Sequence, residues 1–546
     1  MKKILSLILV LSIMLCAFSA CSSDGTGQQM VFPIDNEPQY LDPQIVSDRG
    51  AANIIANCFE GLVTYDETGA IVPAGCEKYE VSADGLTYTF TLRQDANWLV
   101  TRAAKALFPE GEADKFDTRV TAADYVFAFR RVADGATGSA AFSYISSIKN
   151  AAKVHSGKLP KENLGVRAEG DFTFVIELER ADSDLLFALI LPAFVPCNET
   201  FFEMTKGRYC LSTSNIISNG PFYISNWADK TAITARKNES YHSVSAVAPS
   251  SVYFSFNNEK ETRGEKVKSG IYELSPVNGE QAAMLSLEKG VGVKKIVNSY
   301  FSLIFNCSDP VLKNADLRRA LSSSLEKKYF LESTGADETE EASGIIPSVC
   351  RAGGAAYRSG VGTIALSFSG TGAAKSYFEK AKIALEKRGV TLNVLCTQEN
   401  ELNVRKVMQN WQTVLGVKSS ITVETVDAQQ LEQRISSGDF QLAFSNVLLD
   451  SDFALGVLLR FSKSSGDNFS RFDSSKYESL LSAVQSAKTG REYLAALKKA
   501  ERFLADSAVF VPIRSESGYF AAAKGVSGII FSPGGEFVYF KNAVKK

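Results

Sequence analysis

The stretch Ser82–Trp98, SADGLTYTFTLRQDANW, carries the clearest strand pattern in this chain. It contains the turn dipeptide Asp84-Gly85, after which apolar and polar side chains alternate over residues 86–93. A period of two in a segment rich in aromatic and β-branched residues predicts a strand with one apolar and one polar face. Taken alone, this pattern favours a hairpin at the edge of the sheet of some α/β protein.

Further motifs place this strand in a longer pattern. FEGL (Phe59–Leu62) precedes it, and VTAADYVFAFRR (Val120–Arg131) follows it with helical spacing. The set is completed by EPQYLDP at 37–43, NGPFY at 219–223 and a strand–loop–RRAL segment at 299–321. In number, order and spacing these motifs resemble the family 5 extracellular solute-binding proteins of ABC importers, the oligopeptide- and dipeptide-binding group, from Val31 to Phe540.

The resemblance implies a fold class and a domain arrangement. The fold is α/β, a two-lobed periplasmic-binding-protein type II-like fold with an extra domain, in which the ligand is trapped when the lobes close about a two-strand hinge. Residues 1–20 are then a signal peptide and residues 21–29 a tether. The three domains are expected at 30–75, 215–298 and 509–546 (domain I), 76–214 (domain II) and 299–508 (domain III).

Local patterns add individual elements to this arrangement. Met30–Pro33 predicts a first strand, and Ala51–Leu62 predicts a helix closed by Gly61. In the second half, strands expected at 391–397, 420–426 and 441–447 alternate with amphipathic segments. This alternation is typical of a sheet whose strands are joined by crossover helices.

The N-terminus predicts export and lipidation. Lys2-Lys3 precede the apolar run Ile4–Leu15, which is too short to span a membrane comfortably, and Phe18–Cys21 (FSAC) resembles a bacterial lipobox. We expect Cys21 to be lipidated and to become the N-terminus, so that the protein is held at the outer face of the cytoplasmic membrane. The alternative is ordinary secretory cleavage near Ala20, with Cys21 incidental.

Composition bounds the class of protein. The chain has 546 residues, 45% of them hydrophobic, and a net charge of −2. At about 150 residues per domain, this length predicts three to four globular domains, and without a basic excess nucleic acid is not an expected partner. Beyond Cys21, Cys58/Cys76 and Cys197/Cys210 are the cysteine pairs closest in sequence; they could be bridged, or they could be small buried thiols.

Motifs of catalysis are absent from the sequence. It contains no GxSxG elbow, no phosphate-binding loop and no HExxH helix. The two histidines, His155 and His242, sit in polar stretches and are expected at the surface. We therefore expect a binding protein with no reaction and no cofactor. A surface lipoprotein hydrolase is the rival class, because either histidine could belong to a Ser–His–Asp arrangement.

The resemblance implies a peptide ligand, delivered by a monomer to the permease subunits of an ABC transporter. A buried peptide ammonium needs a carboxylate partner. The segment Asn446–Asp452 (NVLLDSD) matches the family stretch that bears this aspartate. Asp452 precedes an aromatic residue, as in the family, whereas Asp450 gives better spacing to the segment 458–461. The alternative is that both aspartates cap a helix at Phe453.

The chain departs from the family pattern in two places. The segment Leu99–Arg119 replaces a tight turn and predicts an expanded surface loop, and the family's tryptophan and proline beside the aspartate are missing. These departures keep other ligands open in the same fold, namely a nickel chelate, haem or a short oligosaccharide, as well as the role of a sensor lipoprotein. We also expect Tyr40, Phe59 and Glu60 to approach the ligand cleft.

Overall fold

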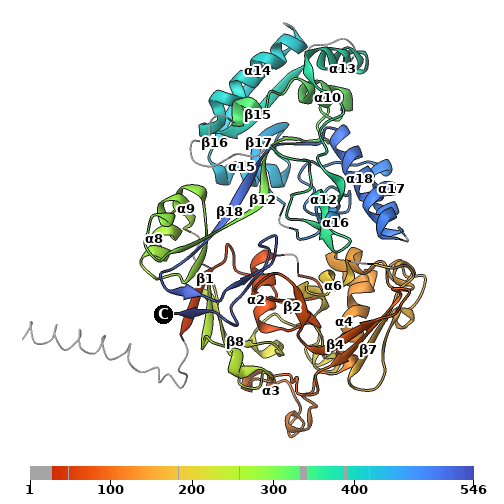
Figure 1. Ribbon diagram of the computed structural model, residues 1–546, viewed down its shortest axis with the longest axis vertical. Helices are drawn as coiled ribbons and strands as arrows, with labels where there is room; N and C mark the ends of the chain where they lie inside the picture. The colour runs from red at the N-terminus through yellow and green to blue at the C-terminus, as the bar shows by residue number, and fades with distance from the viewer. Residues whose placement is uncertain are drawn as a thin grey trace, which may run out of the picture.

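The chain folds into a lower and an upper lobe, joined by the long strands β12 (Gly292–Phe305) and β18 (Phe510–Ala522) (Figure 1). The computed structural model describes residues 28–546 except 47, 183, 257–258, 332–340, 386–389, 417–418, 450 and 488. The lower lobe holds residues 28–291 and 523–546, and the upper lobe holds residues 306–509. The expected limits of three domains stay a prediction.

The first sheet of the lower lobe has the strand order β1-β10-β9-β8. Its strands are β1 (Gln29–Pro33), β10 (Ser251–Ser255), β9 (Ala232–Lys237) and β8 (Phe222–Ala228). β1 runs parallel to β10, while the other pairs are antiparallel. The strand expected at Met30–Pro33 is therefore confirmed, and it joins the start of the chain to residues more than two hundred positions away.

The stretch Ser82–Trp98 forms the interior of a second sheet in the lower lobe, not an edge. The order is β4 (Cys76–Val81), β5 (Thr87–Leu92), β7 (Thr173–Glu177) and β6 (Val166–Ala168). Gly85 adopts a left-handed φ of 70° at the turn between β4 and β5, as the Asp-Gly dipeptide predicts. The helix α4 (Ala122–Ala133) packs on this sheet and begins at Thr121 with a capping box.

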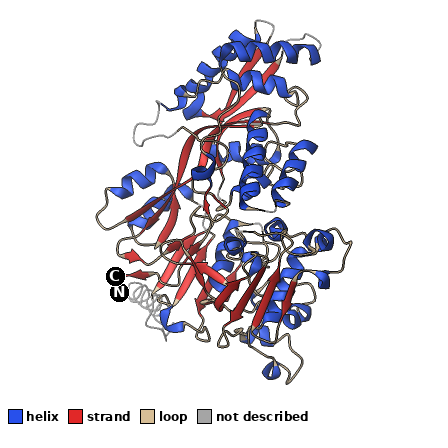
Figure 2. Cartoon of the chain, turned by 45° about the vertical axis from the view of Figure 1, so that its right-hand side comes forward, coloured by secondary structure: helices blue, strands red, loops and turns tan. Residues whose placement is uncertain are grey.

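A third sheet continues from one lobe into the other. Its order is β11-β18-β12-β17-β15-β16, with β11 (Leu274–Val277) in the lower lobe and β17 (Leu442–Leu448), β15 (Thr391–Thr397) and β16 (Ser420–Val426) in the upper lobe. Figure 2 shows these strands running upward between the lobes. β15 is parallel to both β16 and β17, and helices α14 (Glu401–Leu415) and α15 (Ala428–Ser437) provide the crossovers, as predicted.

The remaining elements cover the sheets or lie between the lobes. Helices are α2 (Arg49–Cys58), α3 (Arg102–Lys105), α5 (Ala151–His155), α6 (Leu185–Ala188), α7 (Glu199–Met204), α8 (Arg263–Lys268), α9 (Gly279–Ser286), α10 (Ala315–Ser323), α11 (Lys328–Leu331), α12 (Tyr357–Val361), α13 (Gly370–Ala384), α16 (Ala454–Leu459), α17 (Ser475–Gln485) and α18 (Gly490–Asp506). Short strand pairs are β2 (Val63–Tyr65) with β3 (Ile71–Pro73), β13 (Arg351–Ala352) with β14 (Ala355–Ala356), β19 (Val526–Ser527) with β22 (Val544–Lys545), and β20 (Ile530–Phe531) with β21 (Val538–Tyr539).

Two sequence-based expectations need refinement. The segment Leu99–Arg119 contains the short helix α3, and backbone bridges fasten it at Leu99 to Ser218 and at Arg119 to Asn97. The cysteines at the predicted bridging positions are free and buried, so the alternative of buried thiols is the correct one. Within the described residues, no helix is long and apolar enough to cross a membrane.

The helix expected at Ala51–Leu62 ends earlier, at Cys58, because NGPFY clamps FEGL. Asn219 receives a hydrogen bond from the backbone N of Glu60 at 3.1 Å and donates one to its carbonyl at 2.9 Å. Gly220 donates from its N to the carbonyl of Cys58 at 3.0 Å. The two motifs, far apart in sequence, thus form one contact that holds the backbone after Cys58 extended.

Gly220 tolerates no side chain at this contact. A Cβ there would lie 2.6 Å from the carbonyl carbon of Cys58, which is backbone and cannot turn aside. We expect Gly220→Ala to lower the free energy of unfolding by about 1–3 kcal/mol, measured by chemical denaturation. Gly372→Ala is the control: nothing lies within 4 Å of that Cβ, and alanine in α13 should stabilise slightly. Equal stability of both variants would contradict the clamp.

Candidate ligand-binding site

A cavity of about 860 Å³ lies between the lobes. The lower lobe lines it with Val46, Asp48 and Arg49, which follow the LDP motif and begin α2. The upper lobe lines it with Ser451, Arg460 and Glu478 among other residues. Side chains of both charge signs and many small polar residues therefore face one space that closes only when the two lobes meet. Residues 99–119 do not line it.

A buried ion pair fixes the segment that leads into this cavity. Arg131 of α4 donates to both carboxylate oxygens of Asp42, at 2.6 and 3.0 Å, and both side chains are less than a tenth exposed. The guanidinium also lies 4.2 Å from the centre of the Phe202 ring. Such a bidentate, buried pair holds a fixed geometry, so the LDP motif and the end of VTAADYVFAFRR together position Val46, Asp48 and Arg49.

Removal of one partner of the Asp42–Arg131 pair should lower the stability of the folded protein. Asp42→Asn leaves the Arg131 charge buried without a counter-charge, and we expect the free energy of unfolding to fall by about 3–5 kcal/mol. Chemical denaturation followed by circular dichroism measures this change. Glu80→Gln, which breaks the exposed pair Lys78–Glu80, is the control and should leave the midpoint unchanged. Similar behaviour of the two variants would show that the Asp42–Arg131 pair does not fix this segment.

Asp452 links the two lobes. Its carboxylate accepts hydrogen bonds from the Tyr65 hydroxyl of β2 at 3.2 Å and from the backbone N of Gly534, both in the lower lobe. The side chain is 2% exposed. The N-cap of α16 is Phe453, with no side-chain cap bond, so the alternative that Asp452 caps this helix is wrong. Asp450 lies outside the described residues.

The contact of Asp452 with the lower lobe lies beside the strands β12 and β18 that connect the lobes. β12 and β18 change register at Asn298, whose side chain donates to the carbonyl of Gly534 at 2.9 Å. Gly534 therefore contacts Asp452 of the upper lobe through its N and the hinge through its carbonyl. A Cβ on Gly534 would lie 2.5 Å from the Asp452 carboxylate, which explains why glycine occupies this position.

Burial raises the pKa of Asp452 from its ordinary value of 3.8 to about 6. Hydrogen bonds from Gly534 and Tyr65 and the charge of Arg351 lower this pKa, but loss of hydration outweighs them. Because the pKa is higher in the folded protein, the contribution of Asp452 to stability is complete below the ordinary value and is lost as the pH rises through about 6.

The substitution Asp452→Asn should remove this pH dependence. At about pH 7.5 the variant avoids the cost of a buried carboxylate, and at about pH 5 roughly half of that cost has already gone from the natural protein. The Tm of the variant minus that of the natural protein should therefore be larger at pH 7.5 than at pH 5, measured by calorimetry. Asp229→Asn, at an exposed position, should show no such change. If the difference in Tm between the variant and the natural protein did not change with pH, a raised pKa for Asp452 would be excluded.

The other predicted site residues lie apart from the cavity between the lobes. Phe59 and Glu60 line a second cavity, of about 330 Å³, within the lower lobe. Tyr40 lines neither of these two cavities, nor the smaller space of about 30 Å³ beside them. Whether Phe59, Glu60 or Tyr40 contacts a ligand stays a prediction.

Glu60 is the centre of a polar cluster that the sequence did not reveal. Its carboxylate is 2.6 Å from Nε2 of His242 and accepts a hydrogen bond from the Tyr241 hydroxyl, which also receives one from Lys541 at 3.1 Å. The prediction that His242 is a surface residue is wrong, because its side chain is only 4% exposed. Polar flanking residues suggested exposure, but Glu60 offers this imidazole a buried partner.

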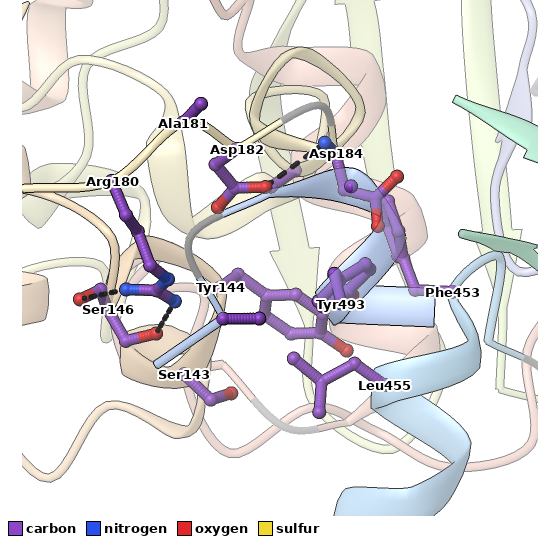
Figure 3. A pocket seen from close by; sticks show the side chains of 13 residues that line it. Ser143, Tyr144, Ser146, Arg180, Ala181, Asp182, Asp184, Phe453, Leu455 and Tyr493 are labelled. Carbon is purple, nitrogen blue, oxygen red and sulfur yellow. Dashed lines mark hydrogen bonds between the residues drawn. The ribbon is translucent and has the colours of Figure 1, made fainter. Parts of the chain in front are cut away.

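The lobes also meet at the side of the cavity, where Figure 3 shows Tyr144, Phe453, Leu455 and Tyr493 together. The rings of Tyr144 in the lower lobe and Phe453 in the upper lobe are 5.5 Å apart. The carboxylate of Asp184 accepts a hydrogen bond from the N of Gly354 at 3.0 Å. The space enclosed there is about 30 Å³, too small for more than water. These residues hold the lobes closed.

The geometry of two lobes, a two-strand connection and a cavity between the lobes agrees with the sequence comparisons. The chain matches the pattern of the bacterial extracellular solute-binding proteins, family 5 Middle, over residues 70–469. The chain belongs to this family. The resemblance seen in the motifs is therefore confirmed, and the family is a class of solute-binding proteins rather than of enzymes.

Individual relatives of this family match the chain over most or all of its length. The chain is similar to the oligopeptide-binding protein OppA of Bacillus subtilis, with 25% identity over 100% of both chains. It is also similar to the dipeptide-binding protein DppE of the same organism, with 22% identity over 92% of this chain and 89% of the relative. The crystal structure of the substrate-binding domain of an oligopeptide ABC transporter from Bacillus anthracis superimposes with a TM-score of 0.75 and 23% identity, covering 96% of this chain and 99% of that one. The predicted fold class is confirmed.

Proposed function

We propose that this protein captures oligopeptides or dipeptides in the cavity between its lobes and delivers them to the permease of an ABC importer. The observation that carries the proposal is the cavity of about 860 Å³, lined by Val46, Asp48 and Arg49 of one lobe and by Ser451, Arg460 and Glu478 of the other. Sites for small ligands commonly span about 300–1,000 Å³. A ligand that contacts both walls stabilises the closed form, because only closure brings those walls together.

The wall chemistry supports a peptide with varied side chains. The strand β17 ends next to the cavity, and an extended peptide can use backbone groups of such a segment irrespective of its own sequence. Small residues such as Ser139, Ser462 and Gly456 line much of the rest, which leaves room for side chains of different shape. Recognition then depends on the peptide backbone and its charged ends.

We assign the peptide ammonium to Asp450. Both carboxylate oxygens of Asp452 accept hydrogen bonds from groups of the lower lobe, so an ammonium there would have to displace Tyr65 or Gly534. Asp450 has the better spacing to 458–461 and carries the second carboxylate of the segment. A buried ammonium without such a partner would cost several kcal/mol.

Lipid attachment at Cys21 would place this binding protein where its partner permease is. The lipobox-like FSAC segment supports the assignment. The tether expected at 21–29 must end before Gln29, because Gln29 already belongs to β1, and the residues before it would link the anchor to the lobes. Capture and delivery, rather than a reaction, is the role that we assign to the chain.

Thermal unfolding with a mixed library of short peptides tests the function. A ligand that binds only the folded protein stabilises it by about 2.7 kcal/mol at a hundredfold excess over its Kd. We expect a rise in Tm of several degrees that is lost when the peptides are N-acetylated and much reduced in Asp450→Asn. Asp473→Asn, at an exposed position of the upper lobe, serves as the control and should respond to peptides like the natural protein.

Other outcomes would redirect the proposal. No shift at millimolar peptide would contradict peptide capture and favour a nickel chelate, haem or a short oligosaccharide in the same cavity. A peptide-induced shift together with unchanged peptide uptake in cells lacking the gene would favour a sensor lipoprotein over an import component. Turnover of an ester, peptide or glycoside substrate would instead indicate a hydrolase.

A further inference from the structure

One flank of the lower lobe exposes apolar side chains in an unusual concentration. Of the large apolar residues that are exposed in the described chain, Leu287 is 88%, Met284 59% and Ile271 58% exposed. Met284 belongs to α9, Leu287 follows it directly, and Ile271 follows α8. We call these three residues the α8–α9 patch. Single exposed apolar residues need no explanation, but a cluster of this kind marks a contact surface.

The ends of α8 and α9 meet, which brings the patch together. Lys268 at the end of α8 pairs with Glu288, the residue after Leu287, at 2.5 Å. Ile271 lies three residues beyond Lys268, and Met284 lies one helical turn before Leu287. In Figure 1 the two helices stand on the flank of the lower lobe that also carries β1 and the end of the chain.

The N-terminal end of the described chain lies next to this patch. Val31 of β1 donates from its backbone N to the Glu273 carboxylate at 2.9 Å, and Glu273 donates from its N to the carbonyl of Val31 at 3.2 Å. Glu273 is two residues from Ile271. The segment 22–28 reaches at most about 25 Å when extended, so an anchor at Cys21 keeps this flank close to the membrane surface.

Lysines surround the patch. A Cβ on Gly270, the neighbour of Ile271, would lie 3.5 Å from Nζ of Lys545, and one on Gly290 would lie 3.0 Å from the side chain of Lys524. Lys289 and Lys524 are exposed on these segments, and Glu265 and Glu280 are exposed on α8 and α9. Lys545 and Lys268 are paired with Glu273 and Glu288. Apolar side chains flanked by lysines suit an anionic bilayer, where apolar groups enter the headgroup region and lysines face lipid phosphates.

We propose that the α8–α9 patch is a membrane-contacting surface that inserts into an anionic lipid bilayer and orients the anchored protein upon it. This inference rests on the proposed lipid anchor for its biological setting, but the contact itself requires no lipid on the chain. A second, weak contact on a protein that is already tethered acts at high effective concentration, so it can orient the protein on the membrane. With the patch on the membrane, the lower lobe is held while the upper lobe is free to rotate about β12 and β18.

Sedimentation with lipid vesicles tests the contact. The mature chain carrying Cys21→Ser, which has no lipid, is mixed with vesicles containing about 30% phosphatidylglycerol in phosphatidylcholine or with phosphatidylcholine alone. We expect binding to the anionic vesicles that weakens when salt is raised, because the lysine contribution is screened. In the same chain, the double variant Met284→Ser with Leu287→Ser should bind at least about tenfold more weakly, since two apolar side chains no longer leave water.

A matched control is available on the upper lobe. Ile383 and Leu402 are 76% and 68% exposed and lie on α13 and α14. The double variant Ile383→Ser with Leu402→Ser should bind vesicles like the unsubstituted chain. Both double variants should have the Tm of the unsubstituted chain and the same peptide-induced shift in Tm. Loss of peptide binding can therefore be distinguished from loss of vesicle binding.

The remaining outcomes overturn the proposal. Absence of binding to anionic vesicles, or equal loss in both double variants, would exclude a membrane contact at this patch. Unchanged vesicle binding in the Met284/Leu287 variant, combined with impaired peptide uptake in cells, would show that the patch binds a protein partner instead.

Discussion

The antiparallel pairing of β12 with β18 is the constraint on which the rest of the structure depends. These strands carry the chain from the lower lobe to the upper lobe and back, and their hydrogen bonds run from Gly292–Ala522 to Ile304–Phe510. The ladder changes register between Val297 and Ser299 and again between Phe301 and Ser302, and paired strands bend at such irregularities. Because these strands connect the lobes, rotation about them would open or close the cavity.

Contacts between the lobes in the described part of the chain are polar and aromatic. Asp452 meets Tyr65 and Gly534, and Phe453 meets Tyr144. A ligand can shift the balance between open and closed forms only by its differential affinity for them. If the lobes were joined by an extensive apolar interface, closure would not depend on a ligand. Polar and aromatic contacts of this kind allow the lobes to close without an extensive apolar interface. Ligand binding can then determine what fraction of the protein is closed.

The cavity walls are rigid because their supports are buried and polar. The Asp42–Arg131 pair fixes the entry to α2, and Asn219 and Gly220 fix the backbone that leaves it. Each of these groups would be costly to bury alone, and each is satisfied by a partner more than sixty residues away in sequence. The motifs EPQYLDP, FEGL, VTAADYVFAFRR and NGPFY are thus joined pairwise by hydrogen bonds, which gives a physical reason for their occurring together.

The sequence by itself determined the elements and the family, since the alternation in 86–93 and the strands at 391–397 and 420–426 are set by local side-chain periodicity. It could not determine which distant groups become partners. The polar neighbours of His242 predict a surface position, yet its side chain contacts Glu60 and is only 4% exposed. Asp452 was a candidate for a peptide ammonium or a helix cap, yet Tyr65 and Gly534 of the other lobe occupy it. Burial and pairing depend on the packing of segments hundreds of residues apart, which only the tertiary structure decides.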